Sequence, residues 1–260
     1  MTVFAEAAFG ARPGRWPLPP ANTPTELWLR AVAAGGQGRY GVALAELDAL
    51  VRTQPRGPLA SLAASTRASF LRQLGGHRAA RGWDGRAWAA AGDDLTAGTD
   101  ALVGLAADAL GLGRYALSAR LLSRAEDVLG SGAVDDRLAV RLAWVRAELA
   151  MFTGDGPAAL EHARRAVGLA SDVGSARHDA KSRVVLAAAL CAVGDPDEAR
   201  KTADDALSTT HEHGLVPLRW ALACLLADIG SAVDSPSRIV AVRDASAALI
   251  RHRGGSWSAR

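Results

Sequence analysis

Three of the seven tryptophans occupy one fixed position relative to a glycine further along the chain. Trp28, Trp144 and Trp220 each precede a glycine by ten residues, so they share one slot of a repeated pattern. Steps of three and four residues extend the same helical stripe to Ser65, Ser69, Arg72, Asp100, Arg141, Glu148, Met151 and Lys181. Indole rings beside arginine and lysine suit the binding of an apolar chain that carries acidic groups or ends in a carboxylate. In the alternative, the tryptophans pack against neighbouring helices, because large aromatic side chains are usually mostly buried.

The motif His211-Glu212-His213 has the residue types of a metal site but not the spacing. Two histidines separated by one residue do not share a helix face, and no third ligand stands nearby. They lie at a predicted helix end, where histidine also interacts favourably with the helix dipole. We therefore expect no metal site, and we expect His162 and His178 to be surface residues or satisfied packing residues.

Cys191 and Cys224, the two cysteines, fall on predicted first helices of adjacent repeat units. No base stands near them in sequence, so inert thiols are expected. Two cysteines exclude a small disulfide framework and fit a reducing cytosol. No glycine-rich phosphate loop, nucleophile elbow or paired-acid motif is present in the sequence. The sequence therefore predicts no catalytic residue, no cofactor and no enzymatic activity.

A repeated pair of helices must position these side chains, and its clearest copy surrounds the turn at residues 194–198. Asp195 can cap a helix, Pro196 suits its first position, and Glu198 completes a capping box. Gly194 ends the preceding helix by tolerating a positive φ. Comparable turn glycines, separated by 37, 38, 41 and 40 residues, are Gly38, Gly75, Gly113, Gly154 and Gly194.

Three columns of residues keep their register with these glycines. An alanine stands seven residues before each glycine, while the positions five and twelve after it hold alanine, serine or leucine. Small side chains at such positions let paired helices cross closely. The joint register of the three columns predicts hairpins of antiparallel helices that stack along the chain.

The phrase Gly38-Arg39-Tyr40-Gly41-Val42-Ala43-Leu44, closed by Leu47, Leu50 and Pro55, resembles a tetratricopeptide repeat (TPR), and Gly113-Arg114-Tyr115 opens a similar helix. The resemblance covers about residues 24–252. The period exceeds the usual 34 residues, and the long helices are more similar to divergent repeats of bacterial regulators and scaffolds. The resemblance to tetratricopeptide repeats implies an all-α, right-handed solenoid of about six antiparallel helix pairs.

In the family that the chain resembles, the tryptophan-bearing face of the first helices lines a concave groove. The predicted partner-binding residues are therefore Trp28, Ser65, Ser69, Arg72, Arg141, Trp144, Glu148, Lys181 and Trp220. The polar helix around Ser65–Gln73 lies in the most basic unit. It is either part of this functional surface or a satisfied polar interface between helices.

The proline-rich run Arg12–Pro20 predicts that residues 1–22 form an extended or mobile arm. Phe4 and Trp16 in this arm either dock onto the first repeat, which we favour, or form a partner-binding peptide. The capping box at residues 23–26 starts the repeat domain, which is expected to reach residue 253.

Two further glycine-rich segments are expected to be irregular. The segment Gly130-Ser131-Gly132 predicts a loop that could act as a mild hinge. Residues 254–260, which contain two glycines and Trp257, are expected to fray at the C-terminus.

Composition favours a helical core and excludes a membrane-spanning segment. Apolar residues make up 49% of the chain and alanine supplies many of them, whereas aromatic residues reach only 5%, which argues against a sheet. No run of about 20 apolar residues occurs. The first residues lack a basic region followed by a long apolar segment, which argues against a secretory signal. We expect a cytoplasmic protein with no membrane partner.

Positive charge is concentrated in the first third of the chain. Residues 1–91 carry 11 arginines and 5 acidic residues, whereas the remainder carries 19 basic and 22 acidic residues. This third could meet an acidic protein or phosphate-bearing surface, or it could reflect an arginine-rich composition solvated on helix faces. A net charge of +3 and the lack of a helix-turn-helix signature disfavour nucleic acid.

These features predict a non-enzymatic protein–protein interaction module or scaffold that binds a peptide or partner protein in its concave groove. The ligand is expected to be acidic or to carry a free carboxylate. The alternative is a regulatory factor associated with transcription or nucleic acid through the basic N-terminal third. The sequence does not distinguish a monomer from a homodimer.

Overall fold

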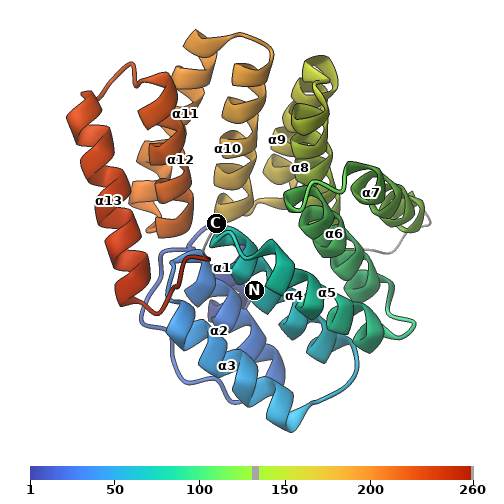
Figure 1. The fold of residues 1–260 in the computed structure, drawn as a ribbon. Coiled ribbons are helices and arrows are strands. Elements are labelled where there is room, and N and C mark those ends of the chain that lie inside the picture. The colour runs from blue at the N-terminus through green and yellow to red at the C-terminus, as the bar shows by residue number, and fades with distance from the viewer. Residues whose placement is uncertain (131–134, 259–260) are drawn as a thin grey trace.

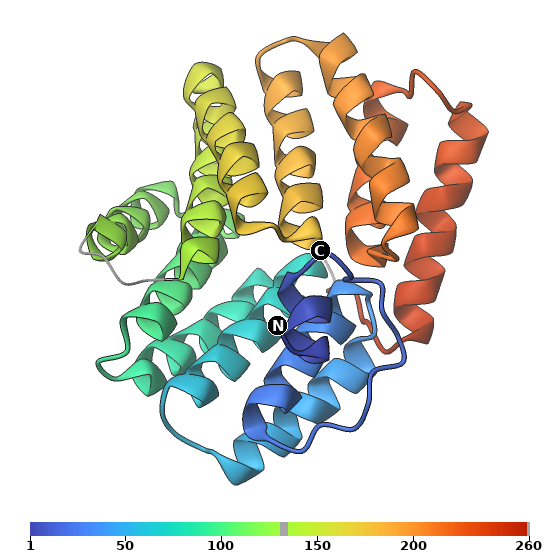
Figure 2. The same cartoon turned by 180° about the vertical axis from the view of Figure 1, so that it is seen from behind.

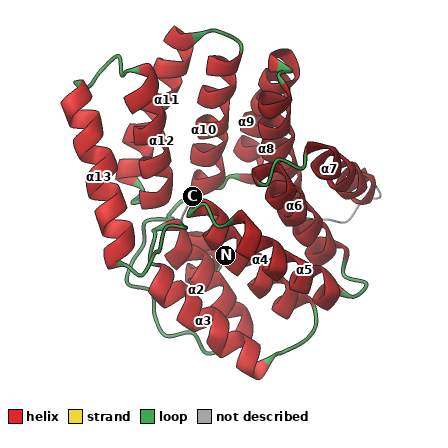
Figure 3. Cartoon of the chain, in the orientation of Figure 1, coloured by secondary structure: helices red, strands yellow, loops and turns green. Residues whose placement is uncertain are grey.

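The computed structural model describes residues 1–130 and 135–258, and every regular element in these ranges is an α-helix (Figure 3). A short helix, α1 (Val3–Phe9), precedes six antiparallel pairs. The pairs are α2 (Pro24–Gly36) with α3 (Tyr40–Thr53), α4 (Pro58–Gln73) with α5 (His77–Ala91), α6 (Leu95–Gly111) with α7 (Tyr115–Gly130), α8 (Asp136–Thr153) with α9 (Gly156–Val173), α10 (Ala176–Ala192) with α11 (Pro196–Glu212), and α12 (Val216–Ile229) with α13 (Pro236–His252). The predicted all-α solenoid of helix pairs is confirmed. The loop predicted at Gly130-Ser131-Gly132 lies mostly outside the described residues.

The three small-residue columns are the contact points of the solenoid. All fifteen residues in them, from Ala31 to Ala206, are 0% exposed. The five turn glycines have φ between +71° and +82°, a conformation in which an L side chain is strained. Side chains this small bring the helices of each hairpin close together, and the glycine reverses the chain between them. The periodicity in the sequence therefore has a direct packing cause.

The first helix of each pair also contacts the first helix of the next pair. Such contacts join α2 to α4, α4 to α6, α6 to α8, α8 to α10 and α10 to α12. The units thus curve around a common centre (Figures 1 and 2). Within the described residues, none of these helices is both long and apolar enough to cross a membrane.

The last unit of the solenoid contacts the first. Arg253 donates from Nη1 to the carbonyl of Gln37 at 2.7 Å, and its own carbonyl accepts from the Gly41 N–H at 2.9 Å. The Ser258 N–H donates to the carbonyl of Leu74 at 2.9 Å. Trp257 packs on Trp220 with ring centroids 4.3 Å apart.

The prediction that the C-terminal tail frays is therefore wrong for residues 254–258. The tail crosses to the first two units (Figure 1). Its Trp257 packs against the apolar cluster there. Gly255 fits only as glycine, since a Cβ would come within 2.5 Å of Ile250 and 2.9 Å of Tyr40.

The N-terminal segment also packs on the solenoid. Phe4, which is 4% exposed, and the α1 alanines bury themselves against Leu29 and Val32 of α2, with Leu18 beside them. The favoured docking of Phe4 and Trp16 agrees with this packing, since Trp16 lies against the same cluster. The expectation of an extended arm is wrong for α1. Residues 3–9 contain no proline, and the Thr2 hydroxyl caps them by accepting from the Ala5 N–H at 3.2 Å.

This segment links two distant parts of the chain. The Gly10 carbonyl accepts from the Ala176 N–H at the start of α10 at 3.2 Å. Gln37, at the end of α2, donates from its side chain to the carbonyl of Pro13 at 2.8 Å. The segment therefore runs between the first and fifth units, where Figure 2 shows it in dark blue. It places Phe9 beside the centre around which the units curve.

Candidate ligand-binding cavity

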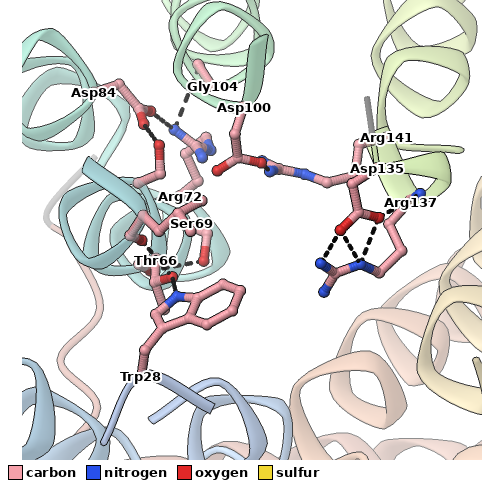
Figure 4. A network of polar contacts seen from close by, with 12 residues as sticks. Trp28, Thr66, Ser69, Arg72, Asp84, Asp100, Gly104, Asp135, Arg137 and Arg141 are labelled. Carbon is pink, nitrogen blue, oxygen red and sulfur yellow. Dashed lines mark hydrogen bonds and ion pairs between the residues drawn. The ribbon is translucent and has the colours of Figure 1, made fainter. Parts of the chain in front are cut away.

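The first helices of all six pairs, together with α1, line a cavity of about 540 Å³. All nine side chains that the sequence predicted for the groove lie in this lining, and Asp100 lies with them. Met151 does not, because it packs in the core with the α8 and α9 alanines. The solenoid thus brings the predicted residues to one surface, part of which Figure 4 shows. That they bind a partner stays a prediction.

Two of the tryptophans are fixed by equivalent hydrogen bonds. Trp28 donates from Nε1 to the Thr66 hydroxyl at 3.0 Å, and Trp144 donates to the Ser182 hydroxyl at 2.8 Å. In both cases the acceptor lies 38 residues later, on the first helix of the next unit. Each ring therefore helps to join successive units, as the packing alternative expected. Its half-buried face still borders the cavity, so apolar contact is what it offers a ligand.

Arg72 lies between two buried carboxylates in the cavity wall. It pairs with Asp84 of α5 and, at 3.1 Å, with Asp108 of α6, and both aspartates are 0% exposed. Ser65 donates its hydroxyl to Asp84 at 3.2 Å. Gly104 makes room for this group, since a Cβ there would come within 2.5 Å of the Asp84 carboxylate. The polar face of α4 is therefore a satisfied interface with α5 and α6 at Ser65 and Arg72. Figure 4 shows Arg72 beside Asp84.

Burial raises the pKa of Asp108 to about 7, with the Arg72 charge opposing the rise and the Asp84 carboxylate adding to it. One Asp108 oxygen, Oδ2, is buried without a hydrogen-bond partner. The ordinary aspartate pKa is about 3.9, so the folded chain binds this proton more tightly than the unfolded chain. The resulting stabilisation is complete below about pH 4 and is lost as pH rises through about 7.

Replacing Asp108 by asparagine should remove this pH dependence. Between pH 5 and pH 8 the wild-type chain should lose roughly 2 kcal/mol more unfolding free energy than Asp108→Asn, because only the wild type must ionise a buried carboxyl. Urea unfolding at the two pH values measures the difference. Asp179→Asn, which alters a more exposed i,i+4 pair with Arg183, should keep the wild-type slope. Equal slopes for Asp108→Asn and wild type would contradict the assignment.

Four of the five cations that line the cavity have a carboxylate partner. Besides Arg72, Arg141 pairs with Asp100, Lys181 with Glu148 at 3.0 Å, and Arg137 with Asp135 through its Nε at 2.8 and 2.9 Å. The fifth cation, Arg177, forms no ion pair or hydrogen bond with the described residues, and its Nε is buried. The predicted cations Arg72, Arg141 and Lys181 are thus largely neutralised by the chain itself.

His178 is a packing residue, in agreement with the sequence expectation. It is 3% exposed, its Nδ1 lies 2.8 Å from the Ser175 hydroxyl, and its ring stacks on Trp144 with centroids 5.3 Å apart. Burial lowers the pKa of His178 well below its ordinary value, and the charges of Arg177, Arg137 and Arg141 lower it further, in that order. The imidazole is therefore neutral at physiological pH. Its environment also shows that three guanidinium groups converge on this part of the cavity.

Among the lining residues that sequence reasoning missed are Phe9, Arg137, Arg177 and His178. Phe9 was missed because it was assigned to the extended arm. A repeat signal does exist for the arginines, since Arg137 and Arg177 each precede a turn glycine by 17 residues. Their side chains meet at Phe9, whose ring centroid lies 3.5 Å from the Arg137 guanidinium carbon and 5.7 Å from that of Arg177.

Other reactive side chains do not form a site. Within residues 1–130 and 135–258, no group of three or more His, Cys, Asp or Glu side chains is arranged to hold a metal ion. Cys191 and Cys224 are free and partly buried, and burial raises the pKa of both thiols. The thiol rather than the more nucleophilic thiolate is thus favoured at both positions.

Comparison with known proteins identifies the fold. No family model matches this chain, and no curated protein matches it in sequence. Among solved structures, the chain is similar to the crystal structure of a Rap protein complexed with competence and sporulation factor, with a TM-score of 0.62. The match covers 89% of this chain and 68% of that chain, at 16% sequence identity. With the helix pairs described above, it supports a TPR-like helical repeat.

Proposed function

We propose that this chain is a non-enzymatic protein–protein interaction module, or scaffold, whose central cavity binds a short peptide or a segment of a partner protein. The observation that carries the proposal is that all six first helices line one cavity, and five of them, all except α6, direct tryptophan, arginine or lysine side chains onto it. Its volume of about 540 Å³ falls within the range typical of ligand sites. The Rap protein, solved with competence and sporulation factor, supports the proposal by structural analogy.

The chemistry of the lining favours an apolar ligand with an acidic group or a free carboxylate. Half-buried tryptophan faces supply apolar area. Five cationic side chains line the cavity, and among the described residues Arg177 alone of these lacks a carboxylate partner. A ligand that adds negative charge can pair with it, whereas a cationic ligand would be repelled.

A binding role is also favoured over catalysis. The cavity carboxylates are engaged in ion pairs with arginine or lysine. The two histidines in the lining, His77 and His178, both have a lowered pKa, for which burial is the largest cause. His178 contacts the Ser175 hydroxyl, but both residues are buried and the pKa of His178 lies well below its ordinary value, whereas general acid–base catalysis works best with a pKa near the operating pH.

The basic N-terminal third offers less free charge to nucleic acid than its sequence suggests. Arg30 pairs with Glu46 at 2.7 Å, Arg67 pairs with Asp48, and Arg72 lies between its two aspartates. The regulatory alternative through nucleic acid therefore gains no support from these residues.

Filling the cavity should abolish ligand capture without unfolding the chain. Ala107 of α6 lines the cavity, so Ala107→Trp places a large ring where the ligand would lie. The full chain is immobilised and incubated with a randomised hexapeptide library, and retained peptides are sequenced. We expect the wild type to retain a peptide family and Ala107→Trp to retain at least tenfold less of it, since a bulky obstruction excludes the ligand sterically.

Ala245→Trp is the matched control, because Ala245 lies on α13 with an exposed side chain and does not line the cavity. It should retain the same peptides as the wild type. Circular dichroism checks that both variants are folded. Equal retention by Ala107→Trp and wild type would place binding elsewhere on the molecule, and no retained family for the wild type would reject peptide binding by the chain.

A further inference from the structure

We propose that Arg177 is the anchor for the ligand's carboxylate, and that the aromatic side chains Phe9, Trp28, Trp144 and His178 hold the apolar group next to it. The proposal rests on the function proposed above, because it assumes that the cavity binds a ligand. It deepens that function by assigning one residue, absent from the sequence prediction, to one chemical group of the ligand.

Packing holds the Arg177 side chain at the cavity. Its aliphatic stem crosses Gly36 of α2, where a Cβ would lie 3.0 Å from the Arg177 Cδ. Its guanidinium carbon lies 5.7 Å from the Phe9 ring centroid. The side chain is partly exposed, but its Nε is buried and finds no acceptor in the described part of the chain. The group is thus positioned but unpaired.

Burying part of a guanidinium without a counter-charge is costly, since no carboxylate compensates for the hydration that it loses. Burial lowers the pKa of Arg177 to about 10, and the nearby charge of Arg137 lowers it further. The other cavity cations are each matched by a carboxylate of the chain. Arg177 is the one cationic side chain in the described lining that a ligand anion could satisfy without displacing an internal partner.

The start of α10 adds positive potential at the same place. Arg177 is the second residue of this helix, and no side chain caps the helix, because the Ser175 hydroxyl bonds His178 Nδ1 instead. The Gly10 carbonyl accepts from the Ala176 N–H, and the positive end of the helix dipole still favours an anion there. A planar carboxylate also matches the forked guanidinium geometry, and such pairs form the stronger hydrogen bonds.

Aromatic faces border this end of the cavity. Phe9 lies 5.5 Å from Trp28 and 6.2 Å from His178, and His178 stacks on Trp144, all measured between ring centroids. An apolar side chain adjacent to the carboxylate would contact these faces. The carboxylate could be the C-terminus of a peptide that ends in an apolar residue, or it could belong to an acidic side chain beside an apolar one.

The test compares peptides that differ only in the carboxylate. A randomised hexapeptide library is presented to the full chain as free acids and, in parallel, as C-terminal amides, and Kd values of the best binders are measured by calorimetry. We expect the wild type to bind peptides that carry a carboxylate and Arg177→Gln to bind the same peptides roughly 10- to 100-fold more weakly, in line with the loss of a charge-assisted hydrogen bond. Arg183→Gln, a change on the same helix outside the lining, should bind as the wild type does.

The amide arm identifies the source of the carboxylate. If amidation alone reproduces the loss seen in Arg177→Gln, the anchor holds the C-terminus. If amidated peptides with Asp or Glu bind tightly and depend on Arg177, it holds a side chain. Either result supports the proposal.

Stability separates this role from simple packing. Without ligand, Arg177→Met should have a Tm equal to or above that of the wild type, because removing an unpaired, partly buried charge relieves its desolvation. A lower Tm with unchanged peptide binding would mean that Arg177 only packs, and would overturn the proposal. Equal binding by wild type and Arg177→Gln would overturn the anchor while leaving the cavity function standing. No binding of either library form by the wild type would overturn both.

Discussion

Arg72→Met should lower the free energy of unfolding by about 3–5 kcal/mol, the usual cost of removing one partner from a buried ion pair. The replacement leaves Asp84 and Asp108, both 0% exposed, without their shared cation. Methionine keeps most of the aliphatic volume, so the loss reports mainly the unpaired carboxylates. We expect this to be the largest effect of any single charge removal among the described residues, since these two aspartates are the fully buried acids in ion pairs.

Urea denaturation followed by far-ultraviolet circular dichroism measures this loss. Arg183→Met is the matched control, because Arg183 pairs with Asp179 in a partly exposed i,i+4 bridge, and it should lose less than about 1 kcal/mol. The triple variant Arg72→Met, Asp84→Asn, Asp108→Asn should recover a large part of the loss, since it removes the stranded charges together. Equal losses for Arg72→Met and Arg183→Met would show that the cluster does not stabilise the second and third units.

Trp257→Ala should cost about 2–3 kcal/mol, because it removes a large apolar contact and an aromatic pair. The ring packs on Trp220, 4.3 Å away between centroids, and against the core of the first units. Its loss weakens the contact that joins the last helix pair to the first. It also removes the support of Trp220, which lines the cavity, so peptide binding should weaken with it.

Thermal unfolding of the full chain tests this prediction. The control is Trp88→Ala, since Trp88 is 42% exposed on α5, and its removal should change stability by less than about 1 kcal/mol. If Trp257→Ala unfolds at the same temperature as Trp88→Ala, the C-terminal tail does not fasten the two ends of the solenoid.

The solenoid could be predicted because its determinants are local and repeated. Ala187 and Gly194 stand in the same relation as Ala31 and Gly38, and the packing between neighbouring units uses these positions each time. The tryptophan slot was predictable for the same reason. Trp28 and Trp144 form matching hydrogen bonds 38 residues downstream, because each unit presents one face to the next.

The contacts between the last unit of the solenoid and the first could not be predicted from that periodicity. Arg253 and Gln37 are 216 residues apart and belong to no shared repeat register. A repeat pattern specifies contacts between consecutive units, but it gives no information about contacts between the first unit and the last. The tail and α1 were therefore assigned to irregular arms, although Trp257 and Phe4 both find apolar surface on the first units of the array.

The sequence also did not show which carboxylates pair with the arginines of the cavity. Arg72 and Arg141 were predicted to serve a ligand, but Asp84, Asp108 and Asp100 satisfy them. These acids come from α5 and α6, and periodicity gives a helix face without saying which side chains meet across it. Arg177 shows the converse, because only the three-dimensional surroundings reveal that it has no carboxylate beside it.

A crystal structure of the full chain with the best peptide from the library tests the central claim most directly. We predict that the peptide lies in the cavity among α2, α4, α8 and α10, with its carboxylate on the Arg177 guanidinium and its adjacent apolar side chain against Phe9 and Trp144. A peptide bound on the outward-facing helices, or one that leaves the cavity empty, would contradict the assignment of function to this cavity.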